Sequence, residues 1–307
     1  MDLTLVIPAF NEAESLPLLF EKIDEAVSPM GLAFEVLIID DGSKDQTFAV
    51  LKELKQQYSF LKAIRFRRNY GKSAALSEGF KAATGKFVIT MDADLQDDPN
   101  EVPNLIAKLE EGFDLVSGWK KERKDPLSKR LPSKLYNRVT SMLSGIRLHD
   151  FNCGLKAYRN EVVKSLSVYG ELHRFLPVLS HQQGFRVTEM AVKHHPRQFG
   201  KSKFGMWRFF SGFFDLMTVM FLTHFKARPL HVFGMIGAPI FLLGNLIEAY
   251  LTVGWFMGVG IRNRPLFFLG ILLIIVGIQF IGTGLVAEMI SAGFSENMRY
   301  SVRERIE

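Results

Sequence analysis

Cysteine is almost absent from this chain of 307 residues, which holds only Cys153. A single cysteine excludes an intrachain disulfide framework and a zinc cluster that needs several thiolates. The sequence also lacks internal repeats, low-complexity tracts and a charged, cleavable apolar leader ahead of the first predicted strand. We therefore expect no signal peptide, and we expect the N-terminal part of the chain to lie in the cytoplasm.

Acidic residues are in the minority, since 38 Lys and Arg stand against 32 Asp and Glu and give a net charge of +6. Such an excess suits nucleic acid, an anionic membrane surface or a phosphorylated substrate. No recognisable nucleic-acid-binding module occurs in the sequence. We therefore expect no nucleic-acid partner and favour membrane lipid and phosphorylated ligands.

Charged residues become scarce in two apolar segments, 231–256 and 266–288, each longer than the roughly 20 residues that cross a bilayer. More basic residues flank the pair on its outer sides than lie in the link, which predicts that both termini are cytoplasmic. The outer residues are Lys226, Arg228, Arg299, Arg303 and Arg305, and the link holds Arg262 and Arg264.

Polar and small residues interrupt these apolar segments. Glu248, near Asn245, is a functional or pairing candidate if it lies deep in the bilayer, and it fits equally well at an interface. Small residues permit close helix packing and are compatible with a homo-oligomer. They are Gly234 with Ala238, and Gly277, Gly282 and Gly284.

The segment 204–225 combines a wide aromatic and aliphatic face with a narrow polar stripe. This pattern is typical of a helix that lies in the bilayer interface, and a buried core helix is the alternative. Ahead of it, a helix is predicted over 126–143, where Arg130, Lys134 and Arg138 share one face. That face is either a solvated charged surface or a basic patch for a membrane or a phosphate.

The first 120 residues alternate between strand-like and helix-like runs. We predict strands near 3–9, 35–40, 62–67, 86–91 and 113–118, and helices near 13–28, 45–58, 72–84 and 99–111. This alternation is typical of βαβ units in a mostly parallel sheet, where ligands bind at the carboxyl ends of the strands.

An apolar run ends in Asp92-Ala93-Asp94. Residues i and i+2 of a strand point to the same face, so we expect both carboxylates to approach one Mg²⁺ or Mn²⁺. These cations prefer oxygen ligands and commonly bridge carboxylates to phosphates. An acidic loop without a ligand is the alternative. Two other polar clusters follow predicted strands, at 8–12 and 40–43, so three clusters are expected to meet in one crevice.

These motifs resemble family 2 glycosyltransferases with the GT-A fold. The resemblance rests on Val6–Glu12, Ile38–Thr47 and Met91–Asp97, and it narrows through Asp150–Lys156 and Arg197–Lys203 to the polyisoprenyl-phosphate, dolichol-phosphate mannose synthase-like branch. The two apolar segments resemble the tail of the bacterial two-span members. The resemblance implies an α/β GT-A (Rossmann-like) domain over 1–200, an interfacial amphipathic region over 201–228, a transmembrane hairpin over 229–290 and a cytoplasmic tail over 291–307.

The resemblance also implies roles for individual residues. Nucleotide-sugar contacts would come from Pro8, Phe10, Glu12, Asp40, Asp41, Asp92, Ala93, Asp94, Gln96, Arg197 and Lys203. Asp92, Asp94 and Gln96 would hold Mg²⁺ or Mn²⁺, with Asp94 the more direct ligand and Asp92 also serving the donor ribose. The lipid phosphate would meet Arg130, Lys134, Arg138 and Lys201.

Asp150 is the candidate catalytic carboxylate on the acceptor side, and we expect it to orient the acceptor more than to deprotonate it. A capping Asp before a strand is the alternative. The chain departs from the mannose synthases at Ser117-Gly118-Trp119, where they carry Gly-Ser-Arg. Lys120 or Lys121 is the candidate replacement for that arginine.

The expected function is inverting transfer of one sugar, with UDP-glucose as the expected donor, to undecaprenyl or dolichyl phosphate at the cytoplasmic face of a bacterial inner or plasma membrane. A processive polysaccharide synthase is disfavoured because its Gln-x-x-Arg-Trp motif does not occur. A non-catalytic lipid transporter or scaffold is disfavoured because the acidic residues are all present.

Overall fold

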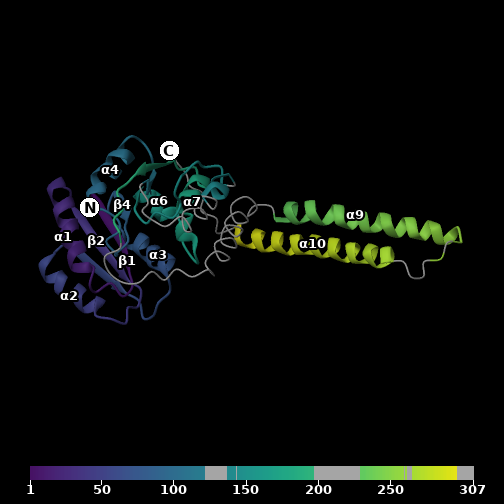
Figure 1. Cartoon of the computed structure of the whole chain (residues 1–307), viewed down its shortest axis with the longest axis horizontal. Helices are drawn as coiled ribbons and strands as arrows, with labels where there is room; N and C mark the ends of the chain where they lie inside the picture. Colours follow the sequence, from purple (N-terminus) through teal and green to yellow (C-terminus); the bar gives the residue numbers. More distant parts are fainter. Residues whose placement is uncertain (122–136, 143, 197–228, 259, 261–264, 296–307) are drawn as a thin grey trace. The chain divides into compact units, whose positions relative to one another are not determined.

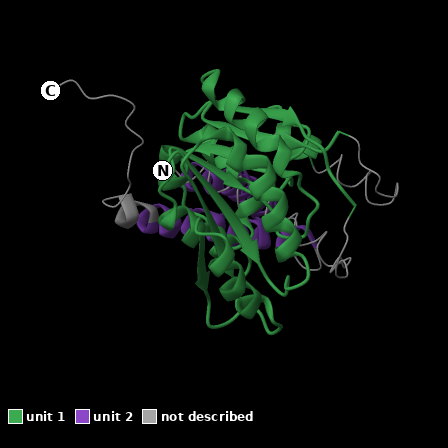
Figure 2. Cartoon of the chain, turned by 90° about the vertical axis from the view of Figure 1, so that its left-hand side faces the viewer, with its two compact units in different colours: residues 1–219, 301–307 green, residues 220–300 purple. Residues whose placement is uncertain are grey.

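The computed structural model describes the chain apart from residues 122–136, 143, 197–228, 259, 261–264 and 296–307. Its contacts divide the chain into two compact units, Met1–Val219 with Ser301–Glu307, and Met220–Tyr300. Figure 2 shows the two units in separate colours.

The first unit is built on a seven-stranded sheet in the order β3-β2-β1-β4-β6-β5-β7 (Figure 1). Its strands are β1 (Leu3–Ala9), β2 (Phe34–Asp40), β3 (Leu61–Arg65), β4 (Phe87–Thr90), β5 (Leu115–Trp119), β6 (Lys156–Arg159) and β7 (Val187–Ala191). The first four and the β5–β7 pair run parallel, whereas β6 lies antiparallel between β4 and β5. The predicted α/β class is confirmed, and the sheet is mixed.

Helices cover both faces of this sheet. They are α1 (Leu16–Val27), α2 (Thr47–Gln57), α3 (Lys72–Ala82), α4 (Val102–Glu110), α6 (Asn160–Ser165) and α7 (Leu176–Gln182), with the short 3-10 helices η1 (Ser28–Met30), η2 (Pro99–Glu101) and η3 (Leu172–Arg174). The predicted strands and helices of the first 120 residues all have counterparts, with small shifts at their ends.

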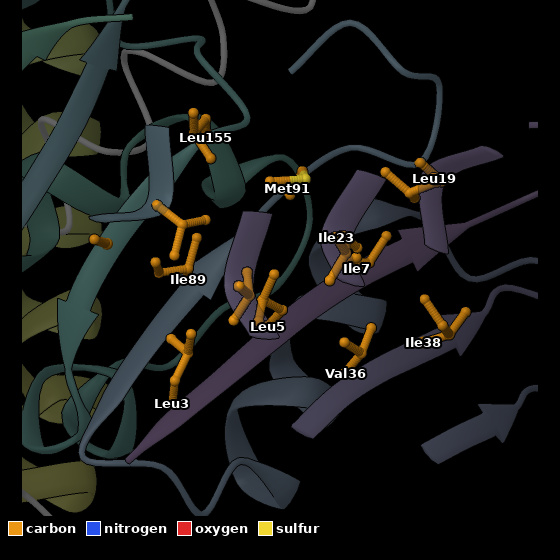
Figure 3. Packing of buried hydrophobic residues seen from close by; sticks show 14 of the residues in the cluster. Leu3, Leu5, Ile7, Leu19, Ile23, Val36, Ile38, Ile89, Met91 and Leu155 are labelled. Carbon is orange, nitrogen blue, oxygen red and sulfur yellow. The ribbon is translucent and has the colours of Figure 1, made fainter. Parts of the chain in front are cut away.

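Continuous apolar runs make the central strands because side chains on both of their faces are buried. On one face, Leu3, Leu5 and Ile7 of β1 pack with α1, α2 and α4 (Figure 3). On the other face, Val6 packs with residues of α3, α6 and α7. Burial of each such aliphatic side chain stabilises the folded state by about 1.5–3 kcal/mol. The core on both faces therefore holds the central strands, and with them the loops at their ends, in place.

The second unit is a pair of helices, α9 (Pro229–Phe256) and α10 (Pro265–Ser295), which contact each other along their lengths. Both are long and apolar enough to cross a membrane. Buried residues recur every seven positions, as in left-handed helix pairs. They are Gly237, Gly244 and Leu251 on α9, and Gly270, Gly277 and Gly284 on α10.

Glycine is required where the two backbones approach closely. A Cβ at Gly277 would lie 2.6 Å from the backbone nitrogen of Phe241, whereas a Cβ at Gly234 or Gly282 would meet nothing within 4 Å. Of the small residues that the sequence singled out, Gly277 and Gly284 therefore serve the pairing within the hairpin. Glu288 of α10 accepts from the Leu230 amide at 3.1 Å and so caps the start of α9.

Candidate active site

The acidic pair follows β4 in a turn and is not on the strand itself. Strand β4 ends at Thr90, and Leu95 adopts a left-handed φ of 62°. The argument that alternation along a strand aligns Asp92 and Asp94 is therefore wrong. The turn places them, because the Asp92 amide donates to Asp97 Oδ2 at 3.1 Å and the Gln96 amide donates to Asp94 Oδ1 at 3.2 Å.

Asp92 is surrounded by lysines. Its Oδ1 forms an ion pair with Lys72, the first residue of α3, and its side chain is one-third exposed. Burial alone would raise the pKa of Asp92, but Lys72, Lys120 and Lys156 together lower it to about 2. This carboxylate stays ionised throughout the physiological range.

Asp94 and Gln96 complete the predicted metal set. Asp94 is 8 % exposed and Ala93 is buried beside it. The Gln96 Nε2 lies 3.5 Å from His194 Nε2 and donates to the His195 carbonyl at 3.4 Å. In the described part of the chain, no three His, Cys, Asp or Glu side chains cluster closely enough to form a metal site on their own. The oxygen set nevertheless fits Mg²⁺ or Mn²⁺, which are usually held by one or two carboxylates together with substrate phosphates.

Asp97 shares the same electrostatic environment. Burial raises the pKa of Asp97 to about 6, with the negative charge of Asp92 adding to the rise and Lys120 opposing it. Lys120 Nζ and His194 Nδ1 each lie 3.9 Å from Asp97 Oδ1. Two acidic groups a few residues apart thus differ widely in their readiness to ionise.

The loop that carries Asp150 packs directly on the acidic turn. A Cβ at Gly154 would lie 2.6 Å from Asp92 Oδ2, and Thr90 Oγ1 donates to the Gly154 carbonyl at 2.8 Å. Asp150 is buried, and its Oδ1 accepts from the Asn152 amide at 3.0 Å. A Cβ at position 154 would force the Asp92 carboxylate to move, so glycine lets the loop and the carboxylate keep this contact.

Cys153, in the same loop, is not a nucleophile. Burial raises the pKa of its thiol to about 12, so the thiol stays protonated.

The buried Lys156 ammonium donates to the main-chain carbonyl of Cys153. Burial lowers the pKa of Lys156, whereas the neighbouring Asp150 and Asp92 act in the opposite direction.

The ends of β1 and β2 carry the other two predicted clusters, at 8–12 and 40–43. Pro8, Phe10 and Glu12 are half-buried there. Ser15 Oγ donates to Glu12 Oε2 at 2.9 Å, and Thr47 Oγ1 accepts from the Glu12 amide at 2.9 Å.

Asp40 and Asp41 both hold backbone in place. Asp40 pairs with Arg65 Nε at 3.2 Å and accepts from the Ser43 amide at 2.9 Å. Asp41 accepts from the Tyr70 and Gly71 amides at 2.7 and 2.9 Å. Asp41 thereby anchors the segment that leads into α3 and Lys72.

Three residues near the acidic turn were not predicted from the sequence: Lys72, Lys156 and His173. Lys72 directly follows Gly71, whose φ of 93° opens α3. Lys156 is the last residue of the Asp150–Lys156 motif, in which only Asp150 was predicted to belong to the site. His173, in η3, contacts Ser73 Oγ through Nδ1 at 2.9 Å. A glycine followed by lysine at the start of a helix, in the connection between a strand and that helix, is the signal that could have identified Lys72.

Lys120 and Lys121, the two candidates for the missing arginine, differ in position. Lys120 lies in the acidic cluster, and its pKa is raised by nearby Cys153, Asp97, Asp92 and Asp150 against the opposing effect of burial. Lys121 is exposed and lies 5.8 Å from the centre of the Trp119 ring. The structure therefore favours Lys120.

Of the other basic residues predicted for the site, Arg138 is exposed. The rest lie outside the described residues: Arg130, Lys134, Arg197, Lys201 and Lys203.

A mixed α/β sheet with an acidic turn after β4, polar loops after β1 and β2 and the Asp150 loop packed on the turn defines the class as a GT-A-type glycosyltransferase. Residues 4–167 match the model of Glycosyl transferase family 2, and the chain belongs to that family.

Curated relatives extend over nearly the whole chain. It is 39 % identical to the dodecaprenyl-phosphate galacturonate synthase of Rhizobium johnstonii, over 95 % of this chain and 88 % of that protein. It is 36 % identical to the undecaprenyl-phosphate 4-deoxy-4-formamido-L-arabinose transferase of Shewanella sediminis, over 98 % of this chain and 91 % of that protein.

Among solved structures, glucosyl-3-phosphoglycerate synthase from Mycobacterium tuberculosis, in complex with Mn²⁺ and UDP-glucose, matches with a TM-score of 0.52 and 19 % identity. The match covers 72 % of this chain and 78 % of that one. At this identity the likeness supports the GT-A fold alone.

Proposed function

We propose that this protein transfers one sugar from a nucleotide-sugar to a polyprenyl phosphate, with inversion at the anomeric carbon. The packing of Gly154 against Asp92 carries the proposal, because it joins the donor-side turn to the acceptor-side loop. The two curated relatives are named for sugar transfer to dodecaprenyl and undecaprenyl phosphate. Their similarity extends through both apolar helices, which supports a membrane-bound enzyme.

In the proposed reaction, an oxygen of the lipid phosphate attacks the anomeric carbon and the bond to the nucleotide diphosphate breaks. The bonding electron pair leaves with the diphosphate, and no proton must be removed from a phosphate that is already a dianion near neutral pH. Asp150 therefore orients the acceptor. Lys72, Lys120 and Lys156 stabilise the negative charge that grows on the leaving group.

The predicted nucleotide contacts are retained in this proposal: Pro8, Phe10, Glu12, Asp40, Asp41, Asp92, Ala93, Asp94, Gln96, Arg197 and Lys203. Asp94, Asp92 and Gln96 would hold Mg²⁺ or Mn²⁺, which would neutralise the diphosphate. Because one oxygen of Asp92 is already paired with Lys72, Asp94 is the more direct metal ligand.

The same proposal covers the acceptor and the membrane. The lipid phosphate would meet Arg130, Lys134, Arg138 and Lys201. We further propose an interfacial segment over 201–228, a hairpin over 229–290 with both termini in the cytoplasm, and transfer at the cytoplasmic face.

The donor is a UDP-sugar. UDP-glucose is the donor expected from sequence, and the galacturonate relative adds UDP-galacturonate as an equal candidate. The test combines purified full-length protein, Mn²⁺ or Mg²⁺, undecaprenyl phosphate and a panel of labelled UDP- and GDP-sugars. We expect lipid-extractable label from one UDP-sugar, abolished by a chelator. Absence of lipid-linked label with every donor would overturn the proposal.

A further inference from the structure

His173, the middle residue of η3, is bonded to the first turn of α3. Its backbone amide donates to Ser73 Oγ at 3.2 Å, and its ring Nδ1 lies 2.9 Å from the same oxygen. Ser73 is 2 % exposed and directly follows Lys72, which forms the ion pair with Asp92. Two contacts to one buried hydroxyl therefore hold His173 next to the residue that neutralises Asp92.

The hydrogen bonds of Ser73 determine which ring nitrogen of His173 carries the proton. Ser73 Oγ already accepts from the His173 amide, and in the described part of the chain its only other partner is Nδ1. A buried hydroxyl hydrogen left without an acceptor costs about 1–3 kcal/mol, so the satisfied arrangement has Ser73 Oγ–H donating to Nδ1. This network places the proton of the neutral ring on Nε2.

The ring of His173 is neutral because it is largely enclosed among cations. Burial, together with Lys72, Arg174 and Lys156, lowers the pKa of His173 to about 2, and Asp92 acts in the opposite direction. Within the residues that the structure describes, Nε2 has no hydrogen-bond partner. His173 thus offers one uncharged N–H donor close to the lysines of the site.

An uncharged donor among lysines distinguishes the parts of a nucleotide-sugar. In the proposed reaction Lys72 and Lys156 supply the positive charge that the diphosphate needs, and hydrogen bonds from charged donors are the stronger ones to phosphate. A neutral N–H instead matches a sugar oxygen, which carries no charge and has lone pairs to accept. Because the transferred sugar is attached to the diphosphate, its oxygens enter the same group of residues.

We propose that His173 Nε2 donates a hydrogen bond to an uncharged oxygen of the transferred sugar, and that Ser73 is the positioning residue that fixes the ring for this contact. The inference rests on the proposed function, in which Asp92 and the lysines meet the donor. It makes His173 a specificity-determining residue, because a sugar without an oxygen at this place leaves Nε2 unpaired and binds more weakly.

The test compares two ligands, UDP and the UDP-sugar that the wild type binds most tightly. Affinities are measured by calorimetry on the full-length protein in detergent with Mn²⁺. We expect His173→Ala to weaken binding of the UDP-sugar about three- to tenfold, as loss of one neutral hydrogen bond does, and to change UDP affinity less than about twofold. Ser73→Ala should give a smaller loss, also confined to the UDP-sugar, because it frees the ring without removing Nε2.

Two further substitutions separate the donor at Nε2 from the anchor at Nδ1. His173→Gln carries an amide N–H near the position of Nε2, so it should recover part of the affinity for the UDP-sugar. His173→Asn reaches only the position of Nδ1. It can keep the contact with Ser73 but should bind the UDP-sugar as weakly as His173→Ala. The reverse order of the two variants would mean that the ring serves only as an anchor, and it would overturn the inference.

His181→Ala is the matched control, since His181 is an exposed histidine on α7. It should leave both affinities unchanged. A loss confined to the UDP-sugar supports the inference even if no lipid-linked label forms, in which case only the proposed function fails. An equal loss for UDP and the UDP-sugar, or wild-type affinities in His173→Ala, overturns the inference even if lipid-linked label does form.

Discussion

Two carboxylates in different units of this protein lie against a glycine of a neighbouring segment. In the catalytic unit, Asp92 lies against Gly154, and in the hairpin, Glu248 of α9 lies against Gly270 of α10. In both places the missing Cβ is what lets the carboxylate approach the backbone. The local packing solution is the same, but the surroundings differ.

Around Asp92 the chain gathers Lys72, Lys120 and Lys156, and the carboxylate remains one-third exposed. Neither α9 nor α10 contains Lys or Arg, and within the described residues Glu248 Oε1 is buried without a hydrogen bond. Asp92 thus has compensating cations beside it and a side open to solvent, whereas the two hairpin helices supply Glu248 with no Lys or Arg. The comparison teaches that compensating charge, more than packing, marks the chemical site.

The largest effect should come from substituting the two acidic residues of the turn, Asp92 and Asp94, one at a time. Asp94→Ala should lower kcat about 1,000-fold at saturating Mn²⁺, on the scale of removing a principal electrostatic group. Asp92→Ala should cost about tenfold less, because Lys72 already neutralises part of its charge. The measurement is lipid-linked label per minute across a Mn²⁺ titration, and the reverse order of the two variants would refute the assignment of Asp94 as the direct ligand.

Removing one compensating lysine makes Asp92 resemble Glu248. Lys156→Met leaves the Cys153 carbonyl without its donor and takes a positive charge from beside Asp92. We expect kcat to fall about 10–100-fold and the free energy of unfolding to fall by about 1–3 kcal/mol.

Lys164→Met is the matched control, because Lys164 also donates to backbone carbonyls, those of Phe80 and Lys81 at the far end of α3. It should lower stability without lowering kcat. Equal losses of kcat in the two variants would mean that Lys156 acts only as a structural donor.

The parts of the fold that follow from local sequence patterns were predictable from the sequence, whereas those that depend on distant contacts were not. Strand and helix periodicity located β1 to β5 and α1 to α4, because apolar runs and turns are local signals. Strand β6 was missed because four residues carry little periodicity, and its antiparallel insertion depends on pairing with β4 and β5.

The carboxylates of the site were identified from motifs, whereas most of its cations were not. Lys72 and Lys156 reach Asp92 from segments distant in sequence. Isolated lysines carry no local pattern, so charge compensation becomes visible only in the folded chain.

In the hairpin, a graded glycine series tests whether packing alone matters there. Gly277→Ala forces a Cβ within 2.6 Å of the Phe241 backbone nitrogen and should cost about 1–3 kcal/mol as overpacking. Gly270→Ala should cost less, because the obstructing atom is the end of the Glu248 side chain, which can rotate. Gly282→Ala meets nothing within 4 Å and should cost nothing measurable. Thermal unfolding in detergent ranks the three, and a ranking with Gly270 first would show that Glu248 is held as rigidly as Asp92.

The last prediction concerns the electrostatic environment beyond Asp92 and is graded with pH, reaching zero near pH 6.5. Burial, together with Lys72, Arg174 and Lys156, lowers the pKa of His173 to about 2. An unfolded histidine takes up its proton near pH 6.5, so below that pH the unfolded state binds more protons than the folded state. The free energy of unfolding should therefore fall as the pH drops from 6.5 toward 4, by up to about 1.4 kcal/mol per unit.

His173→Gln removes this titration, so its free energy of unfolding should depend less on pH over the same interval, whatever its offset at pH 7.5. Urea unfolding of the full-length protein at several pH values gives the two slopes. His181→Gln, at an exposed histidine, should keep the wild-type slope. If His173→Gln keeps it too, the pKa of His173 is not lowered in the folded protein, and burial with the neighbouring cations does not act on this ring as predicted.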